Sequence, residues 1–256
     1  MLVTILLFVG LAVFMAWYFV SKDRGEREPA SALWIALGFG ALGIAPAMGL
    51  EMLLVSREIG TPEGASLGMG MLLWQAMLVG IIEELCKFVP LALFLYKKRY
   101  FNEHTDGILY FAIAGMGFGL PENILYTVMN GAQVGVGRLI LTPFFHAATT
   151  ALVGYFAARA KLAGRPLVSV WWAMLLAIGV HGMYDFGLFS QRPLFMIVSF
   201  MIASGLTGVL FVMAAVAKTR DQQYGLSAVG ENTFCRTCGQ PNAHKFLYCQ
   251  KCGNRA

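Results

Sequence analysis

The segment Ile81-Ile82-Glu83-Glu84-Leu85-Cys86-Lys87-Phe88-Val89-Pro90 places two carboxylates and an amine inside an apolar run that covers about residues 69–96. A helix crosses a bilayer with about 20 apolar residues, so this run is long enough to span one. A charged side chain at the bilayer centre costs at least about 2.5 kcal/mol, and ionisable residues there usually mark a functional site. On a helix Glu83 and Lys87 share a face, whereas Glu84 lies about 100° further round. We therefore expect both acids to face the interior of a helical bundle without pointing at the same partner.

The composition is typical of a multi-span membrane protein. Of the 256 residues, 58% are hydrophobic and 13% are charged, whereas about a quarter of the residues are charged in an average soluble domain. Together with the mean hydropathy of +0.66, these values exclude a soluble globular protein. The net charge is +5, but the basic residues lie mainly in short loops and in the C-terminal tail, where they orient helices. Nucleic-acid binding is therefore not expected.

Seven apolar segments predict an all-α fold, a polytopic helical membrane bundle of about seven transmembrane helices. The first segment has no basic residue before it and is longer than the apolar core of a cleaved signal peptide, so we expect it to stay attached. Glu51, near the end of the second segment, is expected at the membrane interface. The segments cover about residues 1–20, 31–55, 69–96, 106–129, 138–160, 166–189 and 193–217.

Basic residues alternate between the ends of these segments. The connections after segments two, four and six carry single arginines, Arg57, Arg138 and Arg192. The other connections carry clusters of two or three basic residues: Lys22, Arg24, Arg27; Lys97, Lys98, Arg99; Arg159, Lys161, Arg165; and Lys218, Arg220. Because cytoplasmic loops carry the excess of lysine and arginine, we expect the N-terminus outside and the C-terminus in the cytoplasm.

Polar residues at membrane depth also occur in the fourth, fifth and sixth segments. Pro121 removes a backbone donor and is expected to kink or break its helix, which would display Glu122 and Asn123 beside a wet cavity. His146 lies in the fifth segment. His181 lies in the sixth, one turn before Asp185, and this spacing permits a hydrogen bond that fixes the histidine tautomer.

These residues are compatible with more than one function. Glutamate can take a proton from water, and histidine can bind a metal or donate to an oxyanion, which indicates hydrolysis. Acid and histidine chains also form the proton relays of transporters, and the chain could instead be a non-catalytic scaffold whose tail binds a soluble partner. Transporters often contain repeated broken helices, whereas only one broken helix is predicted here and the Glu-Glu motif is not repeated.

Four motifs resemble those of the PrsW family of intramembrane proteases. Glu83-Glu84-Leu85-Cys86-Lys87 is similar to the family's EExxK motif, and Phe118-Gly119-Leu120-Pro121-Glu122-Asn123 to its FxxxEN motif. The stretch 145–150, which contains His146, resembles the third motif, and His181-Gly182-Met183-Tyr184-Asp185 resembles the HxxYD-type fourth. The motifs occur in the family's order, each in its own segment. The family is related to the CAAX prenyl endopeptidases and the bacterial self-immunity membrane proteases, which share a helical core.

The resemblance implies peptide-bond hydrolysis within or beside the cell membrane of a bacterium or archaeon. Glu83 and Glu84 would be essential, and one of them would act as general base on water, with Lys87 and Asp185 in support. His146 and His181 would be oxyanion donors or ligands of a divalent metal, with Glu122 as a further candidate ligand. Asn123 is a candidate oxyanion donor. The implied substrates are membrane-anchored proteins such as anti-sigma factors.

Two cysteine pairs in the tail predict a structural zinc site. Cys235 and Cys238, and then Cys249 and Cys252, form two CxxC turns, each followed by glycine. Four thiolates complete a tetrahedral zinc site, so His244 between the pairs is expected at the surface, and a cytoplasmic tail disfavours disulfides. Because so short a segment lacks a core of its own, the metal would fold it.

These expectations divide the chain into three parts. They are a membrane domain over residues 1–220, a linker over 221–233 and a zinc ribbon over 234–256. The ribbon would recruit substrate or a cytoplasmic protein partner.

Overall fold

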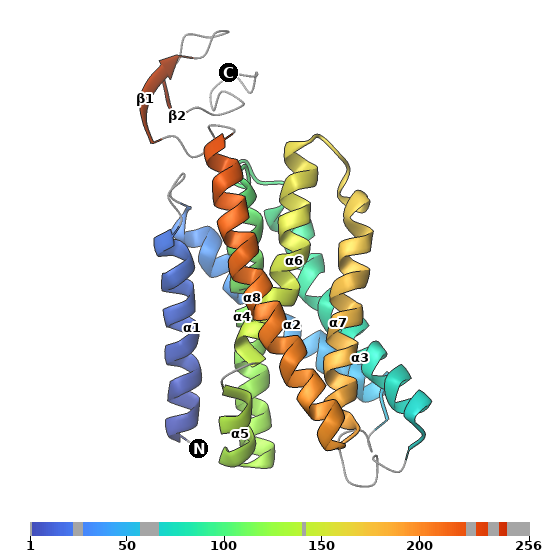
Figure 1. Ribbon diagram of the computed structural model, residues 1–256. Coiled ribbons are helices and arrows are strands. Elements are labelled where there is room, and N and C mark those ends of the chain that lie inside the picture. Colours follow the sequence, from blue (N-terminus) through green and yellow to red (C-terminus); the bar gives the residue numbers. More distant parts are fainter. Residues whose placement is uncertain are drawn as a thin grey trace.

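A computed structural model describes residues 2–22, 28–56, 67–139, 142–223, 229–234 and 241–244. As far as residue 223, the regular structure in this part of the chain is helical (Figure 1). A π-helical turn, η2 (Leu91–Leu95), extends α3, and a 3-10 turn, η3 (Leu167–Val170), leads into α7. Strands β1 (Val229–Phe234) and β2 (Pro241–His244) pair antiparallel. The α-helices are α1 (Leu2–Lys22), α2 (Ala30–Leu54), α3 (Met69–Pro90), α4 (His104–Asn130), α5 (Ala132–Leu139), α6 (Thr142–Leu162), α7 (Trp171–Phe189) and α8 (Pro193–Gln223).

A helix lies at each of the seven predicted apolar segments. Within the described residues, four helical stretches are long and apolar enough to cross a membrane: Ala30–Leu54, His104–Asn130, Leu167–Phe189 and Pro193–Gln223. The outward faces carry large exposed apolar side chains such as Trp34, Trp74 and Leu194, as expected of a surface that contacts lipid. The chain is therefore a membrane protein, and the full count of seven spans stays a prediction.

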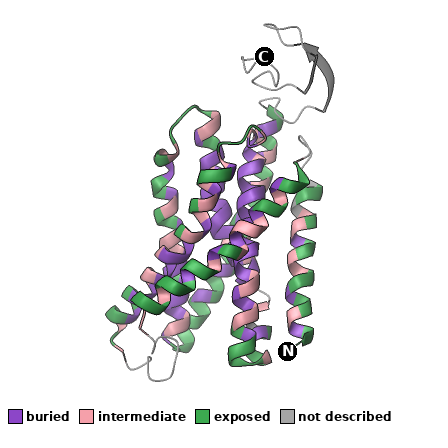
Figure 2. Cartoon of the chain, turned by 180° about the vertical axis from the view of Figure 1, so that it is seen from behind, coloured by how far each residue is buried: buried purple, intermediate pink, exposed green. Residues whose placement is uncertain are grey.

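The long helices form an up-and-down bundle around α4 and α6. Successive long helices run in alternate directions, so the beginning of α1 and the end of α8 lie at opposite ends of the bundle (Figure 1). Nearly all of α6 and the first two-thirds of α4 are buried, and buried residues concentrate at the centre of the bundle in Figure 2. Helix α4 packs against α6 and α2, and α3 packs against α7.

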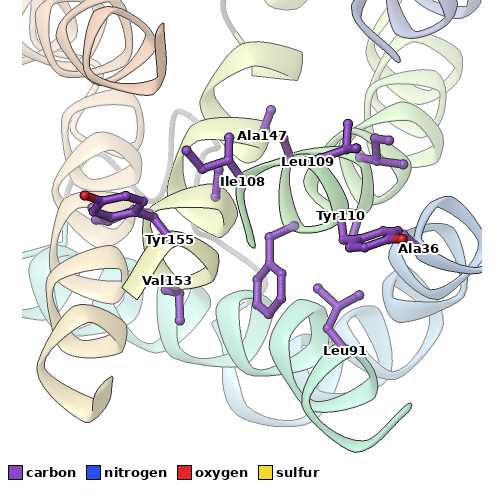
Figure 3. Packing of buried hydrophobic residues seen from close by; sticks show 14 of the residues in the cluster. Ala36, Leu91, Ile108, Leu109, Tyr110, Ala147, Val153 and Tyr155 are labelled. Atoms are coloured by element: carbon purple, nitrogen blue, oxygen red, sulfur yellow. The ribbon is translucent and has the colours of Figure 1, made fainter. Parts of the chain in front are cut away.

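Glycines let α4 approach its neighbours closely. A Cβ on Gly107 would overlap the carbonyl oxygen of Gly154 in α6, and a Cβ on Gly115 would overlap that of His146. Small residues at such interfaces let helix backbones touch, which favours association in membranes. Figure 3 shows the apolar packing, in which Ile108, Leu109 and Tyr110 of α4 are surrounded by other buried residues, among them Ala36 of α2, Leu91 of η2, and Ala147, Val153 and Tyr155 of α6.

Pro121 does not break its helix, contrary to one of the predicted outcomes. Helix α4 continues without interruption from His104 to Asn130, so Glu122 and Asn123 are presented from a helical backbone. Membrane helices tolerate proline where neighbouring elements hold them, and α4 is packed here against both α2 and α6.

The fifth predicted segment is divided in the structure. Helix α6 begins at Thr142, and residues Ala132–Leu139 form a separate short helix, α5. Gly131 joins α4 to α5 with a φ of 90°, a conformation that glycine adopts without steric cost. Arg138 therefore belongs to α5 and not to a loop.

The predicted linker over 221–233 overlaps two elements of the structure. Helix α8 continues to Gln223, and β1 already begins at Val229. Asp221 is buried, and its carboxylate accepts hydrogen bonds of 2.8 Å from the backbone N–H groups of both His104 and Thr105. This cap at the start of α4 explains why the last turn of α8 stays ordered despite its polar sequence. Cys235, Cys238, Cys249 and Cys252 lie outside the described residues, so the zinc ribbon stays a prediction.

Candidate active site

The polar residues predicted on four separate helices converge at one place inside the bundle. Helix α3 contributes three of them, α4 and α7 two each, and α6 one. All are at most 9% exposed, so the groups must satisfy one another. They are Glu83, Glu84, Lys87, Glu122, Asn123, His146, His181 and Asp185.

Lys87 links both acids of the Glu-Glu pair. Its Nζ lies 3.1 Å from Glu83 Oε2 and 3.0 Å from Glu84 Oε1. It also lies 2.9 Å from His146 Nδ1 and 4.3 Å from the centre of the Phe118 ring. The prediction that the two acids would not share a partner is therefore wrong. Residues at i+3 and i+4 are both neighbours on a helix, and the long lysine side chain lies between the two carboxylates.

Glu84 and His181 form the second pair at this place. His181 Nδ1 lies 2.7 Å from Glu84 Oε1, whereas its Nε2 lies 3.6 Å from Glu83 Oε2. When Nδ1–H donates to Glu84, the lone pair of Nε2 faces Glu83. The spacing in the sequence permits Asp185 to fix this tautomer, but its Oδ2 is 3.4 Å from Nε2 and has no hydrogen bond within the described chain. Glu84 orients His181 instead, because its side chain comes closer.

His146 lies between α3 and Glu122. Its Nδ1 accepts from the ammonium of Lys87, so the ring proton is on Nε2, which lies 2.6 Å from Glu122 Oε2. A Cβ on Gly119 would lie 2.7 Å from His146 Cδ2, so the ring rests directly on the backbone of α4. Lys87 thus fixes the tautomer of His146, and the ring is packed between α3 and the backbone of α4.

Arg138 was not predicted as a site residue, but its guanidinium contacts two of those that were. Its Nε donates to Asn123 Oδ1 at 2.7 Å, and its Nη2 forms an ion pair with Glu122 Oε1. Asn123 Nδ2 is buried and finds no hydrogen-bond acceptor among the residues that the structure describes. One signal in the sequence was available: Arg138 is the single charged residue in the stretch 124–158.

Glu51 also approaches this group, although it was expected at the membrane interface. It is close enough to Glu122 and Asp185 for electrostatic interaction. Its Oε1 is buried and has no hydrogen-bond partner within the described ranges. An acid near the end of a membrane segment carries no sequence signal that separates these two locations.

Three of the buried groups have the arrangement of a metal site. Ligand atoms of Glu83, His146 and His181 all lie within 4.8 Å of one another, the one such group among the described residues. Glu83 Oε2 is 3.9 Å from His146 Nδ1 and 3.6 Å from His181 Nε2, and ligands around a tetrahedral zinc lie roughly 3.3 Å apart. The donor set therefore fits a divalent metal, with Glu83 in the place predicted for Glu122. The ammonium of Lys87 contacts two of the same three residues and would compete with a metal.

Comparisons with known proteins agree with this site. The family model described as "PrsW family intramembrane metalloprotease" matches residues 28–217, a range that includes all the site residues. Protease PrsW of Geobacillus kaustophilus is 30% identical over 185 residues, which cover 72% of this chain and 79% of the relative. Protease PrsW of Bacillus subtilis is 29% identical over 171 residues, 66% of this chain and 75% of the relative. Protease PrsW of Clostridioides difficile is 29% identical over 189 residues, 71% of this chain and 77% of the relative. No solved structure matches the chain.

The residues that the family model matches include helices α3, α4, α6 and α7, which carry the buried polar side chains of the site. The chain belongs to the PrsW family of intramembrane proteases.

Proposed function

We propose that this protein is an endopeptidase that hydrolyses peptide bonds of membrane-anchored protein substrates, with Glu83 as the general base. The observation that carries the proposal is the buried group of acids and histidines around Lys87. Glu84 is bound by both Lys87 and His181, and its side chain is 1% exposed. Glu83 has the more accessible side chain, at 8% exposed. A base that must reach water is therefore better assigned to Glu83 than to Glu84.

The reaction follows from these positions. Glu83 takes a proton from a water molecule as the water oxygen attacks the carbonyl carbon of the substrate peptide bond. The negative charge that develops on the carbonyl oxygen requires a donor, and the buried Nδ2 of Asn123 is suited to this role. When the carbon–nitrogen bond breaks, Glu83 returns the proton to the departing amine. The products are a carboxylic acid and an amine.

The neighbouring groups hold Glu83 and its partners in place. Lys87 supplies the positive charge that lets two carboxylates remain buried side by side. Glu84 orients His181, and Glu122 orients His146, so neither imidazole needs to reorganise during the reaction.

The same residues accommodate metal chemistry. Glu83, His146 and His181 would hold a divalent metal, which when bound activates a water molecule at neutral pH and polarises the substrate carbonyl. In that case Glu84 orients the ligand His181 through its Nδ1, the arrangement in which a carboxylate behind a histidine strengthens a metal site. The ammonium of Lys87 must then leave Glu83 and His146.

We further propose that α1, α3 and α6 also cross the membrane, which completes seven spans. The three charged residues of α3 are buried in the bundle and do not face lipid, and most of α6 is enclosed by other helices. With the N-terminus outside, as the basic loops favour, the catalytic group lies in the outer half of the membrane. His146 is about one turn from the start of α6, and α6 begins on the side of the bundle where α1 begins, further in than α5 (Figure 1).

The substrate and the tail complete the proposal. We expect the substrates to be single-span regulators of the anti-sigma type in a bacterial or archaeal membrane. Cys235, Cys238, Cys249 and Cys252 would bind a structural zinc and form a cytoplasmic module that recruits substrate or a protein partner.

Cleavage assays in liposomes test the proposed activity. The purified full-length chain is incubated with a panel of single-span membrane proteins, and the products are identified by mass spectrometry. We expect cleavage by the wild type and none by Glu83→Gln. Failure of the wild type to cleave any member of the panel, combined with proton-coupled uptake that depends on Glu83, would instead favour a transporter.

Metal analysis of the same preparations separates the two forms of the mechanism. A variant with Cys235→Ser and Cys249→Ser removes the predicted ribbon zinc. Bound metal that persists in this variant and is lost when His181→Ala is added would show that the triad holds a metal. Full activity of a metal-free preparation would assign the reaction to Glu83 alone.

A further inference from the structure

Helix α5 is held against α4, the helix that carries Glu122 and Asn123. It packs against α1, α4 and α6. A Cβ on Gly135 would overlap Thr127 Oγ1 of α4 and would lie 3.0 Å from Thr4 Cγ2 of α1. The absence of a side chain at Gly135 therefore lets α5 lie directly on α4, with Arg138 one turn further along. The segment is thus a packed element of the bundle.

The guanidinium of Arg138 contacts two consecutive residues of the site. It donates from Nε to Asn123 Oδ1 at 2.7 Å and pairs through Nη2 with Glu122. Its Cζ lies 4.0 Å from the centre of the Tyr126 ring, one turn further along α4. Its side chain is 16% exposed. A guanidinium offers several donors in a fixed plane, so a single residue can hold an amide and a carboxylate at the same time.

The bond to Asn123 determines which way the amide faces. Because Oδ1 accepts from Arg138, the Nδ2 donor points away from the guanidinium, and it is the atom left without an acceptor in the described structure. Without Arg138 the amide can turn over and present Oδ1 instead of N–H. An oxygen in that position would repel the negative charge that develops during hydrolysis.

The bond to Glu122 reaches the acids of α3 through a chain of close contacts. Glu122 Oε2 lies 2.6 Å from His146 Nε2, and His146 Nδ1 lies 2.9 Å from Lys87 Nζ. Lys87 in turn holds Glu83 at 3.1 Å. Arg138 thus balances the charge of Glu122 at the far end of the chain that ends at the proposed base. Glu122, His146, Lys87 and Glu83 are all buried, so loss of the charge of Arg138 affects the whole chain.

We propose that Arg138 is a positioning residue of the active site and that α5 is the element that delivers it. This inference rests on the proposed function. Arg138 acts through the orientation of the Asn123 amide and through the charge on Glu122. The short helix between α4 and α6 is therefore a functional part of the enzyme.

Steady-state kinetics of the full-length protein in liposomes test this role. Arg138→Gln should lower kcat about 10- to 100-fold, the usual effect of removing a residue that orients catalytic groups. KM should change less than about threefold, because the substrate is not contacted. Arg138→Lys keeps the charge but not the planar guanidinium, so its kcat should lie between that of the wild type and that of Arg138→Gln. Arg192→Gln, an exposed arginine between α7 and α8, is the matched control and should match the wild type.

A double-mutant cycle with Asn123→Ala separates positioning from a general structural effect. If Arg138 acts through Asn123, Arg138→Gln should reduce kcat by a smaller factor in the Asn123→Ala background than in the wild type. If the reduction of kcat in the double variant equals the product of the reductions in the two single variants, Arg138 does not act through Asn123. Should Arg138→Gln fail to fold, Arg138→Lys serves for the same cycle.

The outcomes distinguish this inference from the proposed function. A wild type that cleaves no substrate overturns the proposed function, and this inference with it. An active wild type whose kcat is unchanged in both Arg138 variants overturns this inference alone.

Discussion

Replacement of Lys87 by methionine tests the electrostatic design of the site. Methionine has a similar length and leaves the contact with Phe118, but it removes the cation that lies 3.1 Å from Glu83 and 3.0 Å from Glu84. The ammonium is 0% exposed, and the two carboxylates it pairs with are also buried. The variant therefore leaves two adjacent acids without a compensating charge.

The expected loss in the free energy of unfolding depends on which charges remain buried after Lys87→Met. Removal of one partner from a buried ion pair typically costs about 3–5 kcal/mol, because the other charge stays buried and unpaired. His181 still contacts Glu84 at 2.7 Å, so Glu83 bears most of the loss. We expect Lys87→Met to lower the free energy of unfolding by about 3–5 kcal/mol. The loss should shrink as the pH falls, since protonated acids need no cation.

Equilibrium unfolding in detergent, followed by circular dichroism, measures this loss. Lys98→Met is the control, because this lysine is exposed and its replacement should change stability by less than about 0.5 kcal/mol. A second change, Glu84→Gln, in the Lys87→Met background should restore part of the stability by removing one of the two charges. If Lys87→Met is as stable as Lys98→Met at neutral pH, the buried carboxylates do not depend on the ammonium of Lys87.

Two further predictions concern the helices that position the site. Gly115→Ala places a Cβ on the carbonyl oxygen of His146 and should destabilise the protein by about 1–3 kcal/mol through overpacking. Gly205→Ala, where a Cβ has open space, is the control and should not lower the stability in the same unfolding assay. Equal stability of the two variants would contradict the close packing of α4 on α6. Asp221→Ala removes the α8 carboxylate that accepts from the backbone N–H groups of His104 and Thr105 in the first turn of α4. This change should cost about 1–2 kcal/mol, although the capping box of Glu103 and Asp106 stays in place. Gln223→Ala, an exposed position two residues later, is its control, and an unchanged stability of Asp221→Ala would show that the contact between α8 and α4 contributes nothing.

The positions of the long helices were predictable from the sequence. Apolar runs of about 20 residues, separated by charged or glycine-containing connections, identify membrane helices without any knowledge of their packing. Helix α5 had no such signal, because its eight residues, with two glycines and one arginine, show no apolar run of sufficient length. The prediction therefore assigned Arg138 to the start of the next span.

The convergence of Glu83, Glu122, His146 and His181 was predictable for an energetic reason. Ionisable groups at membrane depth must meet one another, whichever helices they come from. Their individual pairings were not predictable, because they depend on helix rotation and side-chain reach. For this reason Lys87 holds both acids, and Glu84 takes the role expected of Asp185.

Glu51 and Arg138 were missed for a related reason. Both lie near the ends of apolar segments, where charged residues usually face the membrane surface. In the structure Glu51 is close enough to Glu122 and Asp185 for electrostatic interaction, and the short helix α5 brings Arg138 to Asn123 of α4. Only the packing of α2 and α5 against α4 distinguishes these residues from ordinary interfacial charges.

The rate of peptide-bond cleavage by Glu83→Gln shows whether Glu83 is the general base. The variant and the wild type are compared in liposomes with one substrate that the wild type cleaves, after equal thermal stability has confirmed that both are folded. A general base contributes about 10²- to 10⁴-fold to such a rate, so the account predicts a loss of that size. Cleavage by a folded Glu83→Gln variant at a rate close to that of the wild type would contradict it.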